Sequence, residues 1–564
     1  MKKRNLKPIA ALALAAVMLL SLLPGSPKAS AAAPTSAMQS YVEAMQPGWN
    51  LGNSLDSVGA DETAWGNPRV TKELIQNIAA QGYKSIRIPV TWDSHIGSAP
   101  SYTIDPAYIN RVKEVSQWAL DANLYVMINV HHDSWVWLSK MESNHDQTLA
   151  RYNALWTQVA SAFKDSPNKL MFESVNEPRF TDGGTTDEGK QQTLLNELND
   201  SFHSIVRASG SGNTTRPLVI STLEASPSQT RMTATYNAIS KWNDKNIIAT
   251  VHYYGFWPFS VNIAGYTTFN QEVQNDITTT FDNVYNTFVA KGIPVIVGEY
   301  GLLGFDKNTG VIEQGEKLKF FEFIAHYLKQ KQITSMLWDN GQHFSRTQYK
   351  WSDPDLFNLM KASWSGRSAT ASSDLVYVKK GAAAQDKTVS LNLNGRTLSS
   401  LTLNGTALQS GIDYVLNGNS LTFKAAYLTQ LTSSGTLGKR ATIVAKFNGG
   451  VDWKFNVVLY QTPKLSNASG TTSSFSIPTA FNGDQLATME AVYSTGGNAG
   501  PQNWTSFKEF ETTFSPTSNA IKLQPALFNE TNNGTVKLTF YFWSGEKVTY
   551  TIVKNGSSVT GTAS

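Results

Sequence analysis

Eight short apolar runs between about Gln46 and Asn340 set the strongest limit on how this chain can fold. The runs are GWNLG, SIRIPV, YVMINV, LMFESV, LVIST, IIATVHYY, PVIVGEY and SMLWDN. Segments with the apolar spacing of a helix lie between them, as at Leu74, Ile75 and Ile78. Buried strands that alternate with helices form a parallel sheet, and eight of them close into a barrel. The expected fold class is therefore α/β, with a (β/α)8 TIM barrel over residues 34–366.

The helical spacing of apolar residues stops after Trp364. The segment SGRSATASS, residues 365–373, is small and polar, as in a linker. Residues 374–461 then read as alternating strands with turn signals, and the same texture returns over residues 464–560. We expect two all-β sandwich domains after the barrel.

The first residues combine a basic start, an apolar run and small residues at Ala29, Ala31 and Ala33. This order is typical of a secretory signal peptide, here over residues 1–33. A membrane anchor is the alternative, which the short apolar run and the A-x-A site after it disfavour. We expect a secreted, extracellular protein that contacts no membrane once the signal is removed.

The chain beyond that segment is close to neutral, because the segment holds five of the 47 basic residues and none of the 43 acidic ones. No basic field is left to attract nucleic acid. The sequence has no cysteine, which excludes disulfides and thiol catalysis. We expect a monomer with no cofactor and no metal ion.

Polar and aromatic residues gather where the apolar runs give way to loops. In a barrel these carboxyl ends of the strands form the catalytic face. The candidates on this face are Arg87, His131, His132, Asn176, Glu177, His252, Tyr254, Glu299 and Trp338.

Glu177 and Glu299 end the fourth and seventh strands, which face each other across the mouth of an eight-stranded ring. Two carboxyl groups about 5–5.5 Å apart perform glycoside hydrolysis with retention of configuration. Arg87 would hold one of them charged, and the other would have its pKa raised by its neighbour's charge. A structural salt bridge explains either glutamate alone, but the pair favours catalysis.

Adjacent side chains in an extended segment point to opposite faces, so His131 and His132 are expected to form hydrogen bonds rather than to hold one metal ion. Four tryptophans follow strands in the loops. They either extend a sugar-binding groove or cap the barrel, and the pattern leaves both open for Trp92, Trp135, Trp137 and Trp257.

The motifs GWNLGNSLD, SIRIPVTW, NVHHDSW, SVNEPR, VHYYGFWPF, VIVGEYG and LWDNGQHF resemble, in this order, glycoside hydrolase family five. They are most similar to its subfamily four, bacterial endo-β-1,4-glucanases that act on cellulose, mixed-linkage glucan or xyloglucan. The resemblance implies that Glu177 is the acid/base and Glu299 the nucleophile. It also implies the remaining substrate-binding set: Arg87 and Tyr254 beside Glu299, Asn176 at the sugar 2-hydroxyl, His131 and His252 around the cleaved residue, Trp338 as its stacking floor, and His132 and Asn50. Of the loop tryptophans, Trp137 is counted as a further candidate sugar contact.

The two β modules carry resemblances of their own. LTLNGTALQSGIDYVLNGNSLTFKAAYL is similar to immunoglobulin-like X2 modules, and YFWSGEKVTYTIV to a family forty-six carbohydrate-binding module. In the latter, Trp504 and Trp543 are the candidates for stacking on glucan, with Tyr541 as a third.

Three functions fit these patterns. The first is a secreted retaining endoglucanase whose last module helps to hold the polymer. The second keeps the mechanism but acts on mannan or xylan, and the third is a non-catalytic glycan-binding protein on a degenerate barrel. The intact Glu177 and Glu299 speak against the third.

Overall fold

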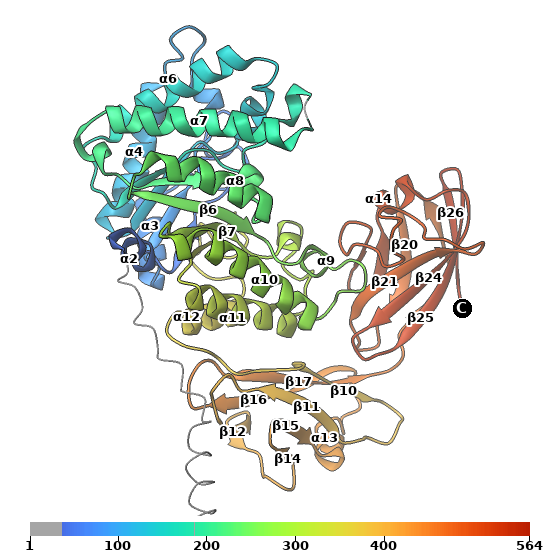
Figure 1. The fold of residues 1–564 in the computed structure, drawn as a ribbon. Coiled ribbons are helices and arrows are strands. Elements are labelled where there is room, and N and C mark those ends of the chain that lie inside the picture. Colours follow the sequence, from blue (N-terminus) through green and yellow to red (C-terminus); the bar gives the residue numbers. More distant parts are fainter. Residues whose placement is uncertain (1–35, 185) are drawn as a thin grey trace, which may run out of the picture.

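The computed structural model describes residues 36–564 apart from residue 185, and Figure 1 shows three modules in this part of the chain. The predicted signal peptide, residues 1–33, lies outside the described residues. Within the described part, no helix has the length and apolar content that crossing a bilayer requires.

The first module is a closed barrel in which consecutive strands pair in parallel, so the predicted fold class is confirmed. The strands are short, and all of their residues are buried except Tyr125, which is half-buried. Their bounds are β1 Gly48–Asn50, β2 Ser85–Ile88, β3 Tyr125–Asn129, β4 Leu170–Glu173, β5 Leu218–Ser221, β6 Ile247–Tyr253, β7 Val295–Tyr300 and β8 Thr334–Leu337.

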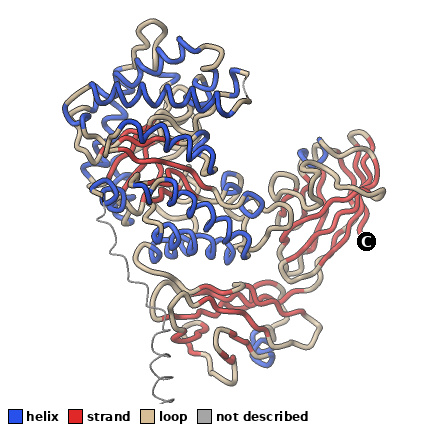
Figure 2. The backbone as a smooth tube through the Cα atoms, viewed as in Figure 1, coloured by secondary structure: helices blue, strands red, loops and turns tan. Residues whose placement is uncertain are grey.

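Helices surround this ring, with the strands inside them in Figure 2. They begin where the sequence supplies caps, as at Thr71 and Asp353, whose side chains accept hydrogen bonds from Leu74 and Leu356 N–H. The helices of this module are α2 Ala37–Ala44, α3 Lys72–Gln81, α4 Pro106–Asp121, α5 Asp133–Val136, α6 His145–Phe163, α7 Glu188–Ala208, α8 Gln229–Ile239, α9 Trp257–Ser260, α10 Gln271–Thr287, α11 Gln314–Gln330 and α12 Pro354–Ser363.

The amino-terminal end of the barrel is apolar. Helix α2 buries Met38 and Val42 against Met127, Met171 and other side chains from the starts of the strands. Sealing this end with apolar groups leaves the polar inward side chains at the opposite, carboxyl end.

Each of the other two modules consists of two sheets. The second module contains β9 Thr370–Ala371, β10 Leu375–Lys379, β11 Lys387–Asn392, β12 Leu398–Leu403, β13 Thr406–Ala407, β14 Tyr414–Asn417, β15 Ser420–Phe423, α13 Ala425–Leu431, β16 Gly438–Phe447 and β17 Trp453–Tyr460. The third contains β18 Lys464–Leu465, β19 Ala468–Thr471, β20 Phe475–Ala480, β21 Leu486–Tyr493, β22 Phe514–Pro516, β23 Ala520–Leu523, α14 Pro525–Asn529, β24 Gly534–Phe542, β25 Lys547–Asn555 and β26 Ser558–Ala563.

The segment predicted as a linker is packed rather than free. Ser368 and Ala369 are fully buried, and β9 pairs with β11 of the second module. Just before them, Arg367 forms a bidentate pair with Glu322 of α11. Small side chains, which the sequence pattern associates with flexibility, here allow the backbone to lie close to its neighbours.

The third module rests directly on the barrel, beside α9 in Figure 1. Lys307 Nζ lies 3.1 Å from Glu509 Oε1, and Asn262 Nδ2 donates to the carbonyl of Ala487 at 3.0 Å. The last module is therefore held next to the loops that follow β6 and β7.

Candidate active site

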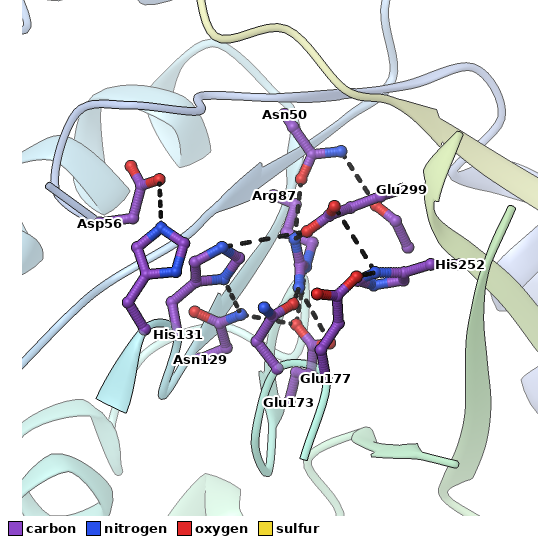
Figure 3. A network of polar contacts seen from close by, with 12 residues as sticks. Asn50, Asp56, Arg87, Asn129, His131, Glu173, Glu177, His252 and Glu299 are labelled. Atoms are coloured by element: carbon purple, nitrogen blue, oxygen red, sulfur yellow. Dashed lines mark hydrogen bonds and ion pairs between the residues drawn. The ribbon is translucent and has the colours of Figure 1, made fainter. Parts of the chain in front are cut away.

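Arg87, on β2, is the centre of the polar network at the carboxyl end of the barrel (Figure 3). Its side chain is fully buried and donates five hydrogen bonds. Two go to Glu173, at 2.7 and 3.1 Å, and one each to Glu299 Oε1 at 2.7 Å, Asn50 Oδ1 at 3.1 Å and Asn176 Oδ1 at 2.7 Å. The planar guanidinium, itself on β2, thus fixes groups from the ends of three other strands, β1, β4 and β7, in one plane.

Glu173 is the main participant that sequence reasoning missed. It ends β4 inside the apolar run LMFE, is fully buried, and also accepts a hydrogen bond from Asn129 Nδ2 at 2.9 Å. A buried carboxylate is costly unless it is paired and hydrogen-bonded, and both oxygens here meet that condition. The available signal was an acidic residue within a fully apolar strand, four residues before Glu177.

Glu299, at the end of β7, is held from two sides. Arg87 donates to its Oε1, and the Tyr254 hydroxyl donates to its Oε2 at 2.6 Å. Burial and the charge of Glu299 raise the pKa of Tyr254 well above its ordinary value, so the phenol keeps its proton and donates. These two donors, one on each oxygen, fix the orientation of the Glu299 carboxylate.

Glu177 follows β4 and leans toward Glu299 with a side chain that is 44% exposed. Its backbone φ is +39°, a conformation that costs a non-glycine residue about 1–3 kcal/mol and that clusters at functional sites. Oxygen atoms of Glu177 and Glu299 and a ring nitrogen of His252 all lie within 4.8 Å of one another. Two carboxyl groups whose nearest oxygens lie below this limit fit the short spacing of a retaining glycosidase, roughly 5–5.5 Å between the groups, rather than the wider spacing of an inverting one.

His252 stands between the two glutamates. The β6–β7 ladder shifts register between Val251 and His252, which brings His252 opposite Glu299. Its Nδ1 lies 2.8 Å from Glu177 Oε1 and 3.5 Å from Glu299 Oε2.

The pKa values around His252 differ from the sequence-based expectation. Burial acts to lower the pKa of His252, but the charges of Glu299 and Glu177 outweigh it and raise the pKa. Burial likewise acts to raise the pKa of Glu177, yet the hydrogen bond from His252 and the charge of Arg87 lower it overall. Without substrate, the shared proton therefore rests on His252, whereas the expectation had placed a raised pKa on the acid/base glutamate.

His131 is a neutral hydrogen-bonding residue. Asn129 accepts from Val90 N–H through Oδ1, so its Nδ2 donates to Glu173 and to His131 Nδ1, at 3.0 Å for the latter. Nε2 must then carry the proton, and burial lowers the pKa of His131 well below its ordinary value. The protonated Nε2 faces Glu299 Oε1 at 4.0 Å.

Asp56, His131 and His132 form a second cluster. Each offers one atom that could bind a metal ion, and these three atoms lie within 4.8 Å of one another. The protonated Nε2 of His131 has no lone pair for a metal ion, and Asp56 already accepts from the N–H groups of Asn53 and Ser54. His132 accepts from Trp135 Nε1 at 2.9 Å. The other ring nitrogen of His132, Nε2, lies 3.5 Å from Asp56 Oδ2.

Trp338, directly after β8, presents a flat ring beside His131. It lies parallel to the His131 ring, with a centroid separation of 5.9 Å and an angle of 4°. A Cβ atom at Gly52 would lie 2.9 Å from the Trp338 ring, so the glycine in GWNLGNSLD is required for this close approach. On the neighbouring strand β1, Asn50 Nδ2 donates to the carbonyl oxygen of Gly298, on β7, at 2.9 Å.

The four loop tryptophans divide into two kinds. Trp92 and Trp137 are 1% and 8% exposed, whereas Trp135 and Trp257 are 39% and 40% exposed. Trp137 donates to Asp133 at 2.7 Å. Trp137 is therefore largely covered by its neighbours in this structure.

Sequence reasoning also missed Trp65, in the loop after β1. It is 39% exposed and its ring lies 4.9 Å from that of His132. No strand or helix pattern surrounds it, so only its exposure identifies it.

In the third module, Trp504 and Trp543 have different surroundings. Trp504 is 59% exposed, with its ring centroid 6.2 Å from that of Trp257 in the barrel. Trp543 packs against the cluster of Tyr377, Val458 and Tyr460 in the second module, and it lines a cavity of about 760 Å³ where the modules meet.

The contacts of Trp543 are those of a residue at the interface between modules. Tyr541 donates to Glu490 and packs on Phe507 at 5.4 Å.

Comparisons with known proteins agree with this division into modules. Residues 50–344 match the cellulase family (glycosyl hydrolase family 5), residues 370–457 match carbohydrate binding domain X2, and residues 461–562 match the carbohydrate binding domain CBM46. Endoglucanase B of Paenibacillus lautus is 75% identical over the full length of both chains.

Solved structures give the same result. The tri-modular endo-β-1,4-glucanase B (Cel5B) from Bacillus halodurans superposes with a TM-score of 0.92 at 58% identity, covering 94% of this chain and 100% of that one. A tri-modular GH5 (subfamily 4) endo-β-1,4-glucanase from Bacillus licheniformis complexed with cellotetraose reaches 0.79 at 31% identity, covering 93% and 99%. This chain belongs to the cellulases of glycosyl hydrolase family 5.

Proposed function

We propose that this endo-β-1,4-glucanase cleaves internal β-1,4-glucosidic bonds by double displacement, with Glu299 as nucleophile and Glu177 as acid/base. The observation that carries the proposal is the placement of the two carboxylates, with oxygens within 4.8 Å of each other on opposite strands of the barrel mouth. A pair that close leaves no room for the extra water of an inverting mechanism.

In the first displacement, Glu299 attacks the anomeric carbon while the glycosidic oxygen departs. Arg87 and Tyr254 hold the carboxylate by one donor on each oxygen, which fixes its direction of attack. Glu177 donates a proton to the departing oxygen. For this, the proton that His252 shares with Glu177 in the free protein moves to the carboxylate as substrate displaces water around its exposed side.

In the second displacement, Glu177 removes a proton from water, and the water attacks the glycosyl–Glu299 ester from the face that the leaving group vacated. Two inversions at one carbon give net retention. Arg87 stabilises the carboxylate as it leaves, because its cationic guanidinium donates to Glu299 Oε1 and is held in place by Glu173.

The aromatic residues support a polymeric β-glucan as substrate. Trp338 would form the floor of the cleaved residue, Asn176 would meet its 2-hydroxyl, and the C–H faces of further sugars would pack on exposed rings. Two of those rings, Trp65 and Trp135, lie beside His132. The other two are Trp257 of the barrel and Trp504 of the third module, which lie next to each other.

Cellulose, mixed-linkage glucan and xyloglucan all fit this description, and mannan or xylan is the alternative substrate class. Product profiling on this set of polymers distinguishes them. We further propose that the protein is secreted, on the basis of the signal-like segment of residues 1–33.

Two variants and a control test the assignment of roles. Glu299→Gln should abolish hydrolysis of carboxymethylcellulose and β-glucan. Glu177→Ala should lose these activities but keep some cleavage of aryl cellobiosides, whose activated leaving groups need no proton. Glu114→Gln, on the surface of α4, is the matched control and should behave as wild type. Near-normal turnover by Glu299→Gln would overturn the proposal.

A further inference from the structure

The loop that carries Trp504 is built around a buried lysine. Lys508 is fully buried, and its Nζ donates to the carbonyls of Pro501 at 2.9 Å and Thr505 at 2.8 Å, with Gln502 O at 3.4 Å. These three carbonyls flank Trp504 on both sides along the chain. An ammonium group has three N–H donors, so it matches this set of acceptors.

The backbone needs this internal partner because of its shape. Gln502 has a φ of +49° and Gly500 a φ of +79°, so the chain turns sharply and directs consecutive carbonyls inward. Buried carbonyls without a donor are costly, and Lys508 supplies the donor from within the turn. The Trp504 side chain is left on the outside, 59% exposed.

Lys508 differs from the other buried lysine of the described residues. Lys317 pairs with the carboxylate of Asp353 at 3.2 Å, whereas no carboxylate of the described chain lies within ion-pair distance of Lys508. Burial lowers the pKa of Lys508 to about 8, so it is still charged at neutral pH. An ammonium buried without a counter-charge is expensive, which points to a specific role for its hydrogen bonds.

The base of the loop is tied to the barrel at the next residue. Glu509 accepts from Lys307, which lies in the loop after β7, and Gln502 Nε2 donates to Glu509 at 3.3 Å. The loop is thus fixed from inside by Lys508 and from outside by the catalytic module. Both fixations set where the Trp504 ring stands relative to Trp257.

We propose that Lys508 is a positioning residue for polysaccharide binding, whose ammonium group holds residues 501–505 in the shape that presents Trp504 beside Trp257. The inference rests on the proposed stacking of β-glucan on Trp504. Preorganisation of this kind removes the entropy cost of ordering the loop when the polymer arrives.

The test measures the affinity of the full chain for soluble mixed-linkage β-glucan by titration calorimetry. All variants carry Glu299→Gln so that the polymer is not consumed. We expect Trp504→Ala to weaken binding at least fivefold and Lys508→Met to weaken it to a similar extent. The double variant should be no weaker than Trp504→Ala alone, because both changes remove one contact. Lys522→Met, an exposed lysine of β23, is the control and should bind as the parent does.

The outcomes separate the inference from the function on which it rests. If Trp504→Ala binds normally, stacking on Trp504 is wrong. If Trp504→Ala is weak but Lys508→Met binds like Lys522→Met, or if the two losses add in the double variant, the positioning role is wrong.

A chemical rescue distinguishes positioning from general loss of folding. The chain contains no cysteine, so Lys508→Cys gives a single thiol. Alkylation of the unfolded variant with 2-bromoethylamine, followed by refolding, restores a side chain of lysine length with a terminal ammonium. We expect the affinity to return to within twofold of the parent. Refolding to the parent's near-ultraviolet circular dichroism without recovery of affinity would overturn the proposal.

Discussion

Glu173 provides the sharpest test of how the barrel holds its catalytic groups. Its Oε2 accepts from Arg87 Nε and Asn129 Nδ2, and its Oε1 accepts from Arg87 NH2. Glu173→Gln keeps the size of the side chain, but in either orientation its amide N–H₂ faces at least one of these donors. The substitution therefore breaks a buried pair and adds a donor–donor contact.

Removing one partner of a buried ion pair costs about 3–5 kcal/mol. Arg87 keeps Glu299 as a partner, which favours the lower end, about 3 kcal/mol. Since 1 kcal/mol shifts Tm by about 2–4 °C in domains of 150–250 residues, the barrel should lose on the order of 5–10 °C.

The same change should slow catalysis, because Arg87 and Asn129 orient Glu299 and His131. A loss of about 2–3 kcal/mol in transition-state stabilisation corresponds to a fall in kcat of roughly 30- to 160-fold. Initial rates on carboxymethylcellulose and calorimetric unfolding measure the two effects separately.

Glu322→Gln is the matched control. Glu322 is also a buried glutamate in a bidentate pair, with Arg367 at 2.9 and 2.6 Å, but it lies on α11 at the boundary with the second module. It should lower Tm and leave kcat within about twofold of wild type. If Glu173→Gln lost stability and kept its kcat in the same way, the role given to Glu173 in orienting the site would be refuted.

Two further predictions concern Tyr254 and Glu313. Tyr254→Phe removes a hydrogen bond to a charged carboxylate, worth about 1.5–3 kcal/mol, so kcat on β-glucan should fall about 10- to 100-fold, and a kcat within twofold of wild type would contradict the role of the hydroxyl. Burial and the neighbouring Asp374 raise the pKa of Glu313 to about 9. The folded protein therefore binds the Glu313 proton more tightly than the unfolded chain does. The stability that this proton contributes to the fold is lost as pH rises toward 9. Differential scanning calorimetry should show Tm falling between pH 5 and pH 9 and a weaker dependence in Glu313→Gln; equal slopes would show that this carboxyl pair is not responsible.

The positions of the strand ends could be predicted because apolar runs mark buried strands and a barrel brings their ends together. Glu177, Glu299, Arg87 and Tyr254 were found by this argument. In the structure Arg87 and Tyr254 bond to Glu299, and an oxygen of Glu177 lies within 4.8 Å of one of Glu299. Glu173 was not, because it lies within the apolar run, where no loop signal draws attention to it.

Properties that depend on contacts distant in sequence were beyond reach. The lowered pKa of Glu177 arises from His252, 75 residues away. Trp135 and Trp137 lie two residues apart, yet one is exposed and the other buried, because a short helix turns them to different sides. Trp543 packs on the second module, a contact that the strand pattern of its own module does not contain.

The central claim is that Glu299 forms the covalent intermediate, and trapping tests it most directly. A 2-deoxy-2-fluoro-cellobioside with an activated leaving group slows the second displacement, because the electronegative substituent destabilises the positive charge that develops at the anomeric carbon in its transition state. Mass spectrometry of the trapped protein should show one added glycosyl group, located by peptide mapping on Glu299 in VIVGEYG. A label on another residue, or full turnover with inversion of configuration and no adduct, would contradict the account.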